Sequence, residues 1–195
     1  MNSIVHRRMK GFTLVEMMVA IALFALLVAF AYPSYTSFIQ NAQIRTAAES
    51  IINGLQLARA EAIRRNSNVE FRLLNTSTGA AVTGGTDWRI MAAAANTPTT
   101  LDQEVQTRRE TSPSSKARAQ VATAVGATAA NPGAGMPATI AFTGLGRLSP
   151  ATTIRQIDIT GASGGRRLAI SLAPGGDVRL CDPLLALATN PQGCS

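Results

Sequence analysis

The residues that could carry out catalysis are few, and their spacing does not suit it. The 195-residue chain has one histidine, His6, which lies ahead of a long apolar stretch, in a segment that we expect to be removed. Its removal would exclude His-based triads and the commonest metal ligand. The carboxylates are scattered without metal-ligand spacing, and Gly175 and Gly176 precede no Lys-Ser/Thr of a phosphate-binding loop. We therefore predict no enzyme, no metal site and no cofactor.

The two cysteines, Cys181 and Cys194, are the remaining reactive side chains, and both lie in the last fifteen residues. In an exported chain, a pair this close in sequence predicts a disulfide that closes a short C-terminal loop. Two free thiols in a cytosolic protein are the alternative. The N-terminus favours export, and with it the disulfide.

The apolar stretch, residues 12–32, is long enough to cross a bilayer as a helix, which takes about 20 residues. Arg7, Arg8 and Lys10 precede it and no comparable basic cluster follows closely, so the positive-inside bias places the N-terminus in the cytoplasm and residues 34–195 outside. A secretory signal peptide is the competing interpretation. It fits less well, because the run is longer than a signal core and no small-x-small cleavage site follows.

Glu16 is an acidic residue inside this apolar stretch. A carboxylate in a membrane helix costs on the order of 2–3 kcal/mol at the bilayer centre, so it needs a partner. No basic residue nearby in the helix supplies one. Cleavage before Phe12 would create an α-amino group there, and in an assembly of parallel helices this amine could pair with the Glu16 carboxylate of a neighbouring subunit.

The segment Lys10-Gly11-Phe12-Thr13-Leu14-Val15-Glu16 resembles the type III signal of type IV pilins and type II secretion pseudopilins. In that family a prepilin peptidase cuts after the glycine and methylates the new N-terminal phenylalanine. The resemblance implies a leader over residues 1–11, a cut between Gly11 and Phe12, and an assembly role for Glu16. It also implies a single-pass anchor over residues 12–33 in the bacterial inner membrane and a periplasmic domain over 34–195, which later reaches the pilus or cell surface. The implied partners are other pilins, through the first helix.

Beyond Pro33, which matches the family's proline, the pattern becomes amphipathic. Apolar residues recur every three or four positions, at Ile44, Ala48, Ile51, Ile52, Leu55, Ala58 and Ala62. We predict one helix of about fifty residues with a kink at Pro33, ending near residues 66–68, with Glu61 and Arg65 forming an i,i+4 pair. Its second half packs on the domain.

The periodicity then shortens to two, which predicts strands. They span residues 69–74, 87–92, 103–108, 139–142, 154–160, 166–172 and 177–181. The last two flank Ala173-Pro174-Gly175-Gly176, a strong hairpin signal. Residues 111–137, rich in small and polar residues, predict a long mobile loop. The expected fold class is α+β, a long helix packed on antiparallel sheet.

This half resembles the FimT/FimU–GspH family of minor pilins and pseudopilins, through the helix segment 55–65, the Trp88 strand, and residues 166–171 and 179–181. We expect Trp88 in the core rather than at a base-stacking surface. FimT-type members are linked to DNA uptake through a Gly-Arg-x-Arg motif. Here Gly176-Asp177-Val178-Arg179 keeps the second arginine and reverses the first charge.

The candidate DNA-binding residues are therefore Arg166, Arg167 and Arg179, and their contacts to phosphate would be non-specific and salt-sensitive. A solvated hairpin with interface arginines is the interpretation that we favour. Three hypotheses remain: a structural minor pilin of a pilus initiation or tip complex, a DNA receptor at the pilus tip for natural transformation, and a type II secretion pseudopilin. The terminal cysteine pair looks more like the pilus proteins.

Overall fold

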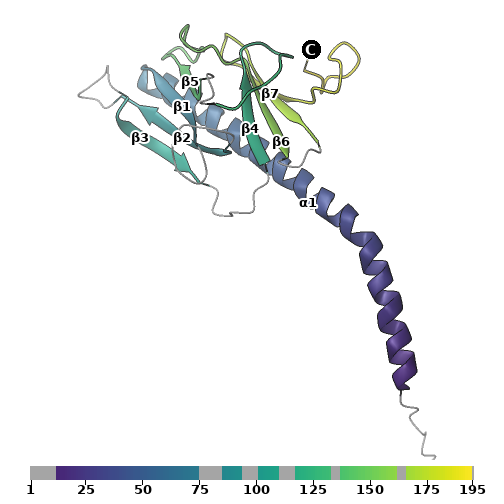
Figure 1. Ribbon diagram of the computed structural model, residues 1–195. Helices are drawn as coiled ribbons and strands as arrows, with labels where there is room; N and C mark the ends of the chain where they lie inside the picture. Colours follow the sequence, from purple (N-terminus) through teal and green to yellow (C-terminus); the bar gives the residue numbers. More distant parts are fainter. Residues whose placement is uncertain are drawn as a thin grey trace, which may run out of the picture. The chain divides into compact units, whose positions relative to one another are not determined.

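The computed structural model describes residues 12–74, 85–93, 101–109, 117–132, 137–161 and 166–194, without the side chains of residues 31–34. The chain divides into two compact units, Met1–Phe38 and Ile39–Ser195. One helix, α1 (Leu14–Arg65, 52 residues), runs through the boundary between them (Figure 1). The predicted helix of about fifty residues is therefore confirmed.

Both ends of α1 are fixed by local sequence. At the start, the Glu16 N–H donates a 3.2 Å hydrogen bond to Thr13 Oγ1, which makes Thr13 the N-cap. At the end, Asn66 adopts a φ of 48°, a left-handed conformation that asparagine tolerates. The Ser67 N–H then bonds to the Ala62 carbonyl and the Asn66 N–H to the Ile63 carbonyl, both at 3.2 Å. This pair of bonds is a Schellman motif, and it stops the helix where the sequence predicted.

Residues Ile39–Ser195 contain two four-stranded antiparallel sheets. The first has the order β3-β2-β1-β5 and the second the order β4-β6-β7-β8. Figure 1 shows the strands fanned around the second half of α1. The strands are β1 (Val69–Leu74), β2 (Asp87–Ala92), β3 (Gln103–Arg108), β4 (Ala117–Ala122), β5 (Thr139–Phe142), β6 (Gln156–Gly161), β7 (Leu168–Leu172) and β8 (Val178–Cys181).

One apolar core joins the helix to both sheets. The predicted helical face is buried, except that Ile52 is only partly buried. Against it pack large apolar side chains of the first sheet, such as Phe71 and Ile90, and of the second, such as Ile157 and Ile170. The expected α+β class is confirmed. The strands form two sheets instead of one. The alternation of apolar and polar residues along single strands could not indicate this division.

Trp88 connects the helix to the first sheet. It is 3% exposed, its ring lies 5.6 Å from that of Phe71, and its Nε1–H donates a 3.0 Å hydrogen bond to Ser50 Oγ on α1. Gly54 lies against both rings, since a Cβ there would be 2.7 Å from Phe71 Cε2 and 2.9 Å from Trp88 Cε2. The prediction that Trp88 is a core residue is confirmed.

The first three strands and β5 have the predicted bounds, and β6, β7 and β8 differ by one or two residues at their ends. The prediction of an unbroken loop over 111–137 is wrong at residues 117–122, which form β4 beside β6. Its inward residues, Ala117, Ala119 and Val121, alternate as in any strand but are small, so their apolar signal is weak. Parts of the predicted loop, residues 111–116 and 133–136, lie outside the described residues.

Candidate functional site

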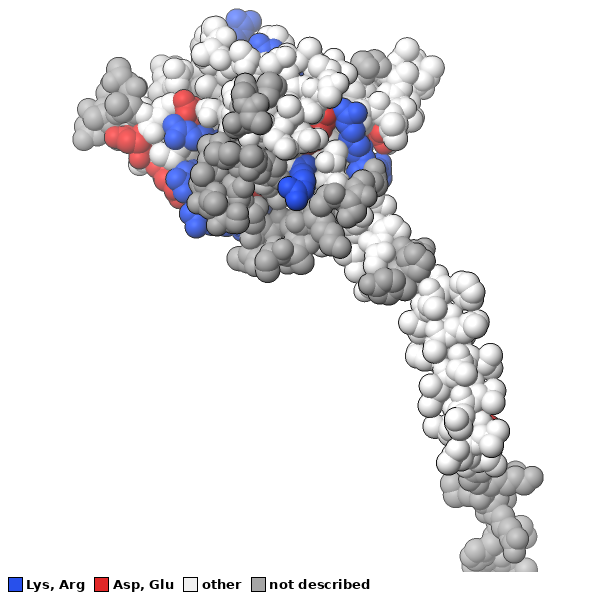
Figure 2. Space-filling view, in the orientation of Figure 1, with Lys and Arg blue, Asp and Glu red and all other residues white. Residues whose placement is uncertain are grey.

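The first half of α1 presents an uncovered apolar surface. An 18-residue window of this helix has a mean hydropathy of 2.6, and none of it is buried. Among the described residues, α1 is the one helix long and apolar enough to cross a membrane. Figure 2 shows the corresponding surface almost free of charged side chains. A helix that is apolar all round requires lipid or other helices around it.

Phe12 and Glu16 lie at the start of this surface. Phe12 is 79% exposed and precedes the helix, while Glu16 occupies the third helical position and is exposed. Gly11, the predicted cleavage residue, lies outside the described residues. A carboxylate in the first helical turn also interacts favourably with the partial positive charge of the helix N-terminus. Glu16 therefore has a local stabilising role that is independent of any partner subunit.

Pro33, the predicted kink, is within the continuous helical backbone of α1, although its side chain is outside the described residues. Proline has no N–H, so the Ala29 carbonyl one turn earlier has no helical donor at position 33. The kink itself remains a prediction.

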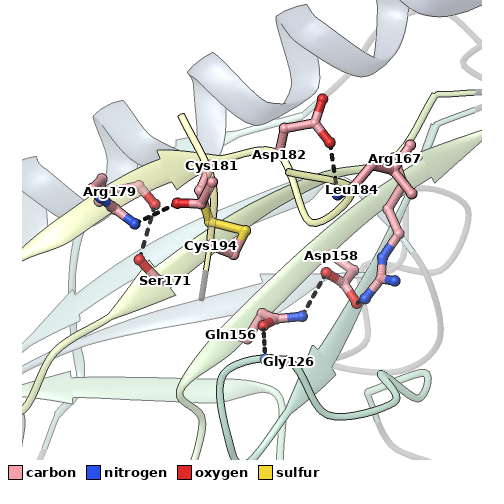
Figure 3. Close-up of a disulfide and its surroundings, with 11 residues drawn as sticks. Gly126, Gln156, Asp158, Arg167, Ser171, Arg179, Cys181, Asp182, Leu184 and Cys194 are labelled. Atoms are coloured by element: carbon pink, nitrogen blue, oxygen red, sulfur yellow. Dashed lines mark hydrogen bonds and ion pairs between the residues drawn. A yellow bond between two sulfur atoms is a disulfide. The ribbon is translucent and has the colours of Figure 1, made fainter. Parts of the chain in front are cut away.

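The C-terminal residues form a loop held on the second sheet. Cys181 at the end of β8 is joined to Cys194 by a disulfide, as predicted, with a sequence separation of 13. Both cysteines are buried and pack with Ala169 of β7. The Arg179 guanidinium adds a 2.7 Å hydrogen bond from Nη2 to the Gly193 carbonyl (Figure 3). The loop is thus attached covalently and by hydrogen bonding to the same strand.

The three candidate DNA-binding arginines each have a partner within the chain. Arg179 binds Gly193, as above. Arg166 lies 3.6 Å from Asp182, and Arg167 Nη2 lies 2.7 Å from Asp158 Oδ2. Arg166 and Arg167 precede β7 rather than lying on it, which corrects the predicted bounds of that strand. The structure therefore does not gather the three guanidinium groups into one uncompensated basic site.

Asp158 is part of a buried polar network that sequence reasoning missed. It is 1% exposed and accepts a 2.8 Å hydrogen bond from Gln156 Nε2 as well as that from Arg167. Gln156 Oε1 in turn accepts a 2.7 Å bond from the Gly126 N–H, which ties the segment after β4 to the sheet (Figure 3). The signal was present, because Gln156 and Asp158 alternate with Ile157 and Ile159 along β6. This alternation could not show that other parts of the chain cover the polar face of β6.

The domain surface carries charges of both signs. On the face shown in Figure 2, basic and acidic side chains are interleaved. At the end of α1, Glu61 forms ion pairs with Arg64 at 2.7 Å and Arg65 at 2.9 Å, which confirms the predicted i,i+4 pair. The hydrogen bonds from Arg64 and then Arg65 lower the pKa of Glu61, and the bond to Glu61 raises the pKa of Arg64. These pairs stabilise the helix end and offer no catalytic arrangement.

No group of three or more metal-ligating side chains occurs within the part of the chain that the structure describes. The features left to explain are the bare apolar helix with Phe12 and Glu16 at its start, and a domain with the terminal disulfide loop.

Comparison with protein families gives a match over the apolar helix and a match over most of the domain, which ends before the disulfide loop. Residues 47–176 match the family described as type II transport protein GspH, and residues 6–32 match the prokaryotic N-terminal methylation motif. The chain belongs to the GspH family. The GspH family comprises structural pilins and pseudopilins, so membership implies assembly with other pilins and processing by a prepilin peptidase. Together with the apolar helix, the methylation motif indicates a membrane-anchored subunit.

Solved structures of similar proteins include two crystal forms of the type IV minor pilin FimU of Pseudomonas aeruginosa PAO1 and the solution structure of E. coli GspH. The FimU chains are 22% and 19% identical, with TM-scores of 0.45 and 0.47, covering 81% and 77% of this chain and 99% of theirs. The GspH structure is 15% identical, with a TM-score of 0.46, covering 73% of this chain and 89% of its own. These values are too low to transfer a function. Comparison with curated protein sequences gives no significant match.

Proposed function

We propose that this GspH-family chain is a minor pilin incorporated into a type IV pilus, where it acts as a structural subunit of the initiation or tip complex. In this proposal the anchor crosses the inner membrane once, with the N-terminus in the cytoplasm and the C-terminal domain in the periplasm. The subunit then leaves the membrane for the pilus.

The observation that carries this proposal is the exposed apolar surface on the first half of α1. No described residue covers this surface. In the membrane, lipid would cover it. In a filament, the same surface would be covered by the first helices of neighbouring subunits. One helix can serve both states because its side chains are apolar on every face.

Glu16 gives the assembly a register. If the prepilin peptidase cuts between Gly11 and Phe12, the new amine lies one helical turn from Glu16 along the sequence. The carboxylate of one subunit could then pair with the amine of the next in a low-dielectric environment, where an unpaired charge is costly. This pairing would favour one axial stagger between parallel helices over the alternatives.

A type II secretion pseudopilin is the second candidate, and the description of the matched family favours it. The terminal disulfide favours the pilus, because such a cysteine pair resembles those of pilus minor pilins. The two candidates share every property of α1 discussed above. Deleting the encoding gene in the native cell separates them, since one predicts loss of pili and the other loss of secreted enzymes.

A DNA receptor at the pilus tip is the third candidate. Arg166, Arg167 and Arg179 motivate it, but each has a partner within the chain and Asp177 carries the opposite charge. We therefore assign DNA uptake to this chain only as an alternative, with its own test in the Discussion.

The test of the assembly role is Glu16→Ala in the full chain. Because an acidic residue in a membrane helix costs free energy, the variant should insert into the membrane at least as well as the wild type. Its amount in sheared filaments, measured by immunoblotting, should fall at least about tenfold if the lost pair contributes more than about 1.4 kcal/mol.

Glu16→Gln is the matched control for a merely local effect. Glutamine can still take part in a capping box with Thr13, but it carries no charge. We expect it to behave like Glu16→Ala. Wild-type amounts of either variant in filaments would contradict the pairing role, and recovery by glutamine alone would assign Glu16 to helix capping.

A further inference from the structure

Strand β8 forms the outer edge of the second sheet, and the hydrogen-bonding pattern defines which of its backbone groups face outward. The Ala173 N–H donates to the Asp177 carbonyl at 2.9 Å, which closes the β7–β8 hairpin. In an antiparallel pair every second residue bonds to the partner strand. Arg179 and Cys181 therefore bond to β7, while Val178 and Leu180 direct their N–H and C=O groups away from it.

Asp182, the next residue in this outward series, supports the assignment. Its N–H points away from β7 and donates a 2.7 Å hydrogen bond to the Gln192 carbonyl, where Asp182 and Gly193 form a parallel bridge. The terminal segment thus starts an additional strand at this edge but pairs only at Asp182. No described residue pairs with the outward backbone groups of Val178 and Leu180.

At the other sheet edges, part of the outward backbone is paired or the side chains are polar. Beside β4, Val121 exchanges two backbone hydrogen bonds with Ala130, and beside β5, the Ala141 carbonyl accepts from the Ser149 N–H. Edge strand β3 has the sequence QEVQTR, and its charged and polar side chains discourage pairing. Within the described part of the chain, β8 combines unpaired outward backbone groups with the partly exposed apolar side chain of Leu180.

A hollow of about 300 Å³ lies next to this edge, between β8 and α1. Leu168 of β7 and Leu180 of β8 give it apolar walls, and Leu180 is 36% exposed. Arg45 of α1 and Arg166 line it as well. An extended chain laid along β8 would place alternate side chains in this hollow, since strand side chains alternate between faces.

The charges at the hollow favour an acidic residue on the incoming chain. Arg45 pairs with Glu49 at 2.9 Å and Arg166 with Asp182 at 3.6 Å, but the arginine side chains remain 72% and 51% exposed. A guanidinium has five N–H donors, so each arginine can bind a second carboxylate while keeping its present partner.

We propose that the edge of β8 binds an extended segment of a neighbouring subunit, which adds to the second sheet through the outward N–H and C=O groups of Val178 and Leu180. An apolar side chain of that segment contacts Leu168 and Leu180, and a carboxylate binds Arg45. This is strand addition at an open sheet edge. It rests on the proposed assembly role for the identity of the partner, a neighbouring subunit.

The experiment uses the full chain in detergent micelles and a labelled seven-residue peptide that alternates valine with threonine around one central glutamate. Fluorescence anisotropy measures binding, with empty micelles as the blank. We expect Leu180→Pro, which removes an outward N–H but no bond to β7, to weaken binding about tenfold relative to Leu180→Ala, which keeps that N–H. Arg45→Ala should weaken binding of the glutamate peptide. A peptide with lysine in place of the central glutamate should also bind the wild-type protein more weakly.

Hydrogen exchange on the unaltered protein gives a second measurement, which holds even if Leu180→Pro fails to fold. The peptide should protect the amides of Val178 and Leu180 and leave that of Arg179 unchanged, because it is already bonded to β7. Absence of peptide binding, or binding without this protection, overturns the proposal. Peptide binding does not depend on Glu16, so the two proposals can fail separately. If filaments lack the Glu16→Ala variant, the assembly role is supported even when the peptide does not bind.

Discussion

Glu16 can contribute both to the start of its own helix, together with Thr13, and to the proposed contact with a neighbouring subunit. Thr13-Leu14-Val15-Glu16 has the spacing of a capping box, and the Thr13 hydroxyl does accept the Glu16 N–H. A helix that begins in an apolar environment gains from such a cap, because water is not available for its first N–H groups. The cap uses the backbone of Glu16, while its carboxylate interacts with the partial positive charge of the helix N-terminus. In the proposed assembly the same charge would also pair with the amine of a neighbouring subunit.

Gly11 sets the prediction on processing. The Gly-Phe junction is the plausible cleavage site ahead of the apolar run, so replacing Gly11 by leucine should leave full-length protein in the membrane. Gly11→Ala is the matched control, since its small side chain should permit at least partial cleavage. N-terminal sequencing by mass spectrometry measures the outcome, and a processed protein that starts anywhere other than Phe12 would refute this site.

The hairpin arginines set the prediction on DNA. The wild-type protein should not retain DNA even at low salt, because Asp182 and Asp158 offset the charges of Arg166 and Arg167, and because Asp177 repels phosphate. Asp177→Arg, which restores the motif of FimT-type proteins, should bind weakly and without sequence preference, and lose affinity steeply with salt. Gel-shift titrations at two salt concentrations measure both.

A different result would support the DNA-uptake alternative. If the wild type binds DNA at low salt, and if removing each of the three arginines weakens binding by a similar amount and flattens the salt dependence, the hairpin is a phosphate-binding surface. Arg72→Ala is a control, because Arg72 lies on β1 and pairs with Glu70.

At the scale of elements, the contact between α1 and the first sheet depends on a missing side chain. Gly54→Ala should gain about 1 kcal/mol in helix propensity, yet the new Cβ would lie within 3 Å of the rings of Phe71 and Trp88. Overpacking of this kind costs about 1–3 kcal/mol, so we expect a net decrease in thermal stability. Asn53→Ala, one residue away and exposed, should be neutral or stabilising. Thermal unfolding followed by circular dichroism tests both, and a raised Tm for Gly54→Ala would contradict the packing.

The disulfide is the second element-scale device. Its closed loop should contribute roughly 3 kcal/mol through the unfolded chain. Replacing Cys181 and Cys194 by serine should speed hydrogen exchange in residues 182–194 more than in α1 or β1, because the bond closes a loop at one end of the domain. Mass spectrometry should find no alkylated thiol in unreduced protein from an oxidising compartment. Two alkylated cysteines, or exchange that rises equally in the core, would contradict this account.

On the scale of the whole molecule, the sequence predicted the helix and strands well where the apolar periodicity is strong. The second half of the helix and strands β1 and β2 follow from spacing, since large apolar side chains mark their buried faces. Strand β3 has a weaker pattern, in which Val105 is partly buried and the other side chains are polar. Strand β4 was missed because its buried positions are mostly alanine, which is no stronger a strand signal than a loop residue.

The arrangement of polar groups was beyond the sequence for another reason. Arg166 and Arg167 remain 51% and 38% exposed, but their partners, Asp182 and Asp158, could not be identified from the sequence because only the fold brings them near. A charge pattern indicates which residues are polar, not which of them meet. The same applies to the hydrogen bond between Gly126 and Gln156, which joins residues 30 positions apart.

Trp88 is the one tryptophan in the sequence, and it lies at the junction between α1 and the first sheet. Its intrinsic emission therefore reports on that junction alone. While the indole stays buried against Phe71 and bonded to Ser50, emission should lie at short wavelength, and it should move to the red when the helix separates from the sheet and water reaches the ring. The terminal loop contributes no such signal, so opening of the loop and loss of the helix–sheet contact can be distinguished optically in one sample without any added dye.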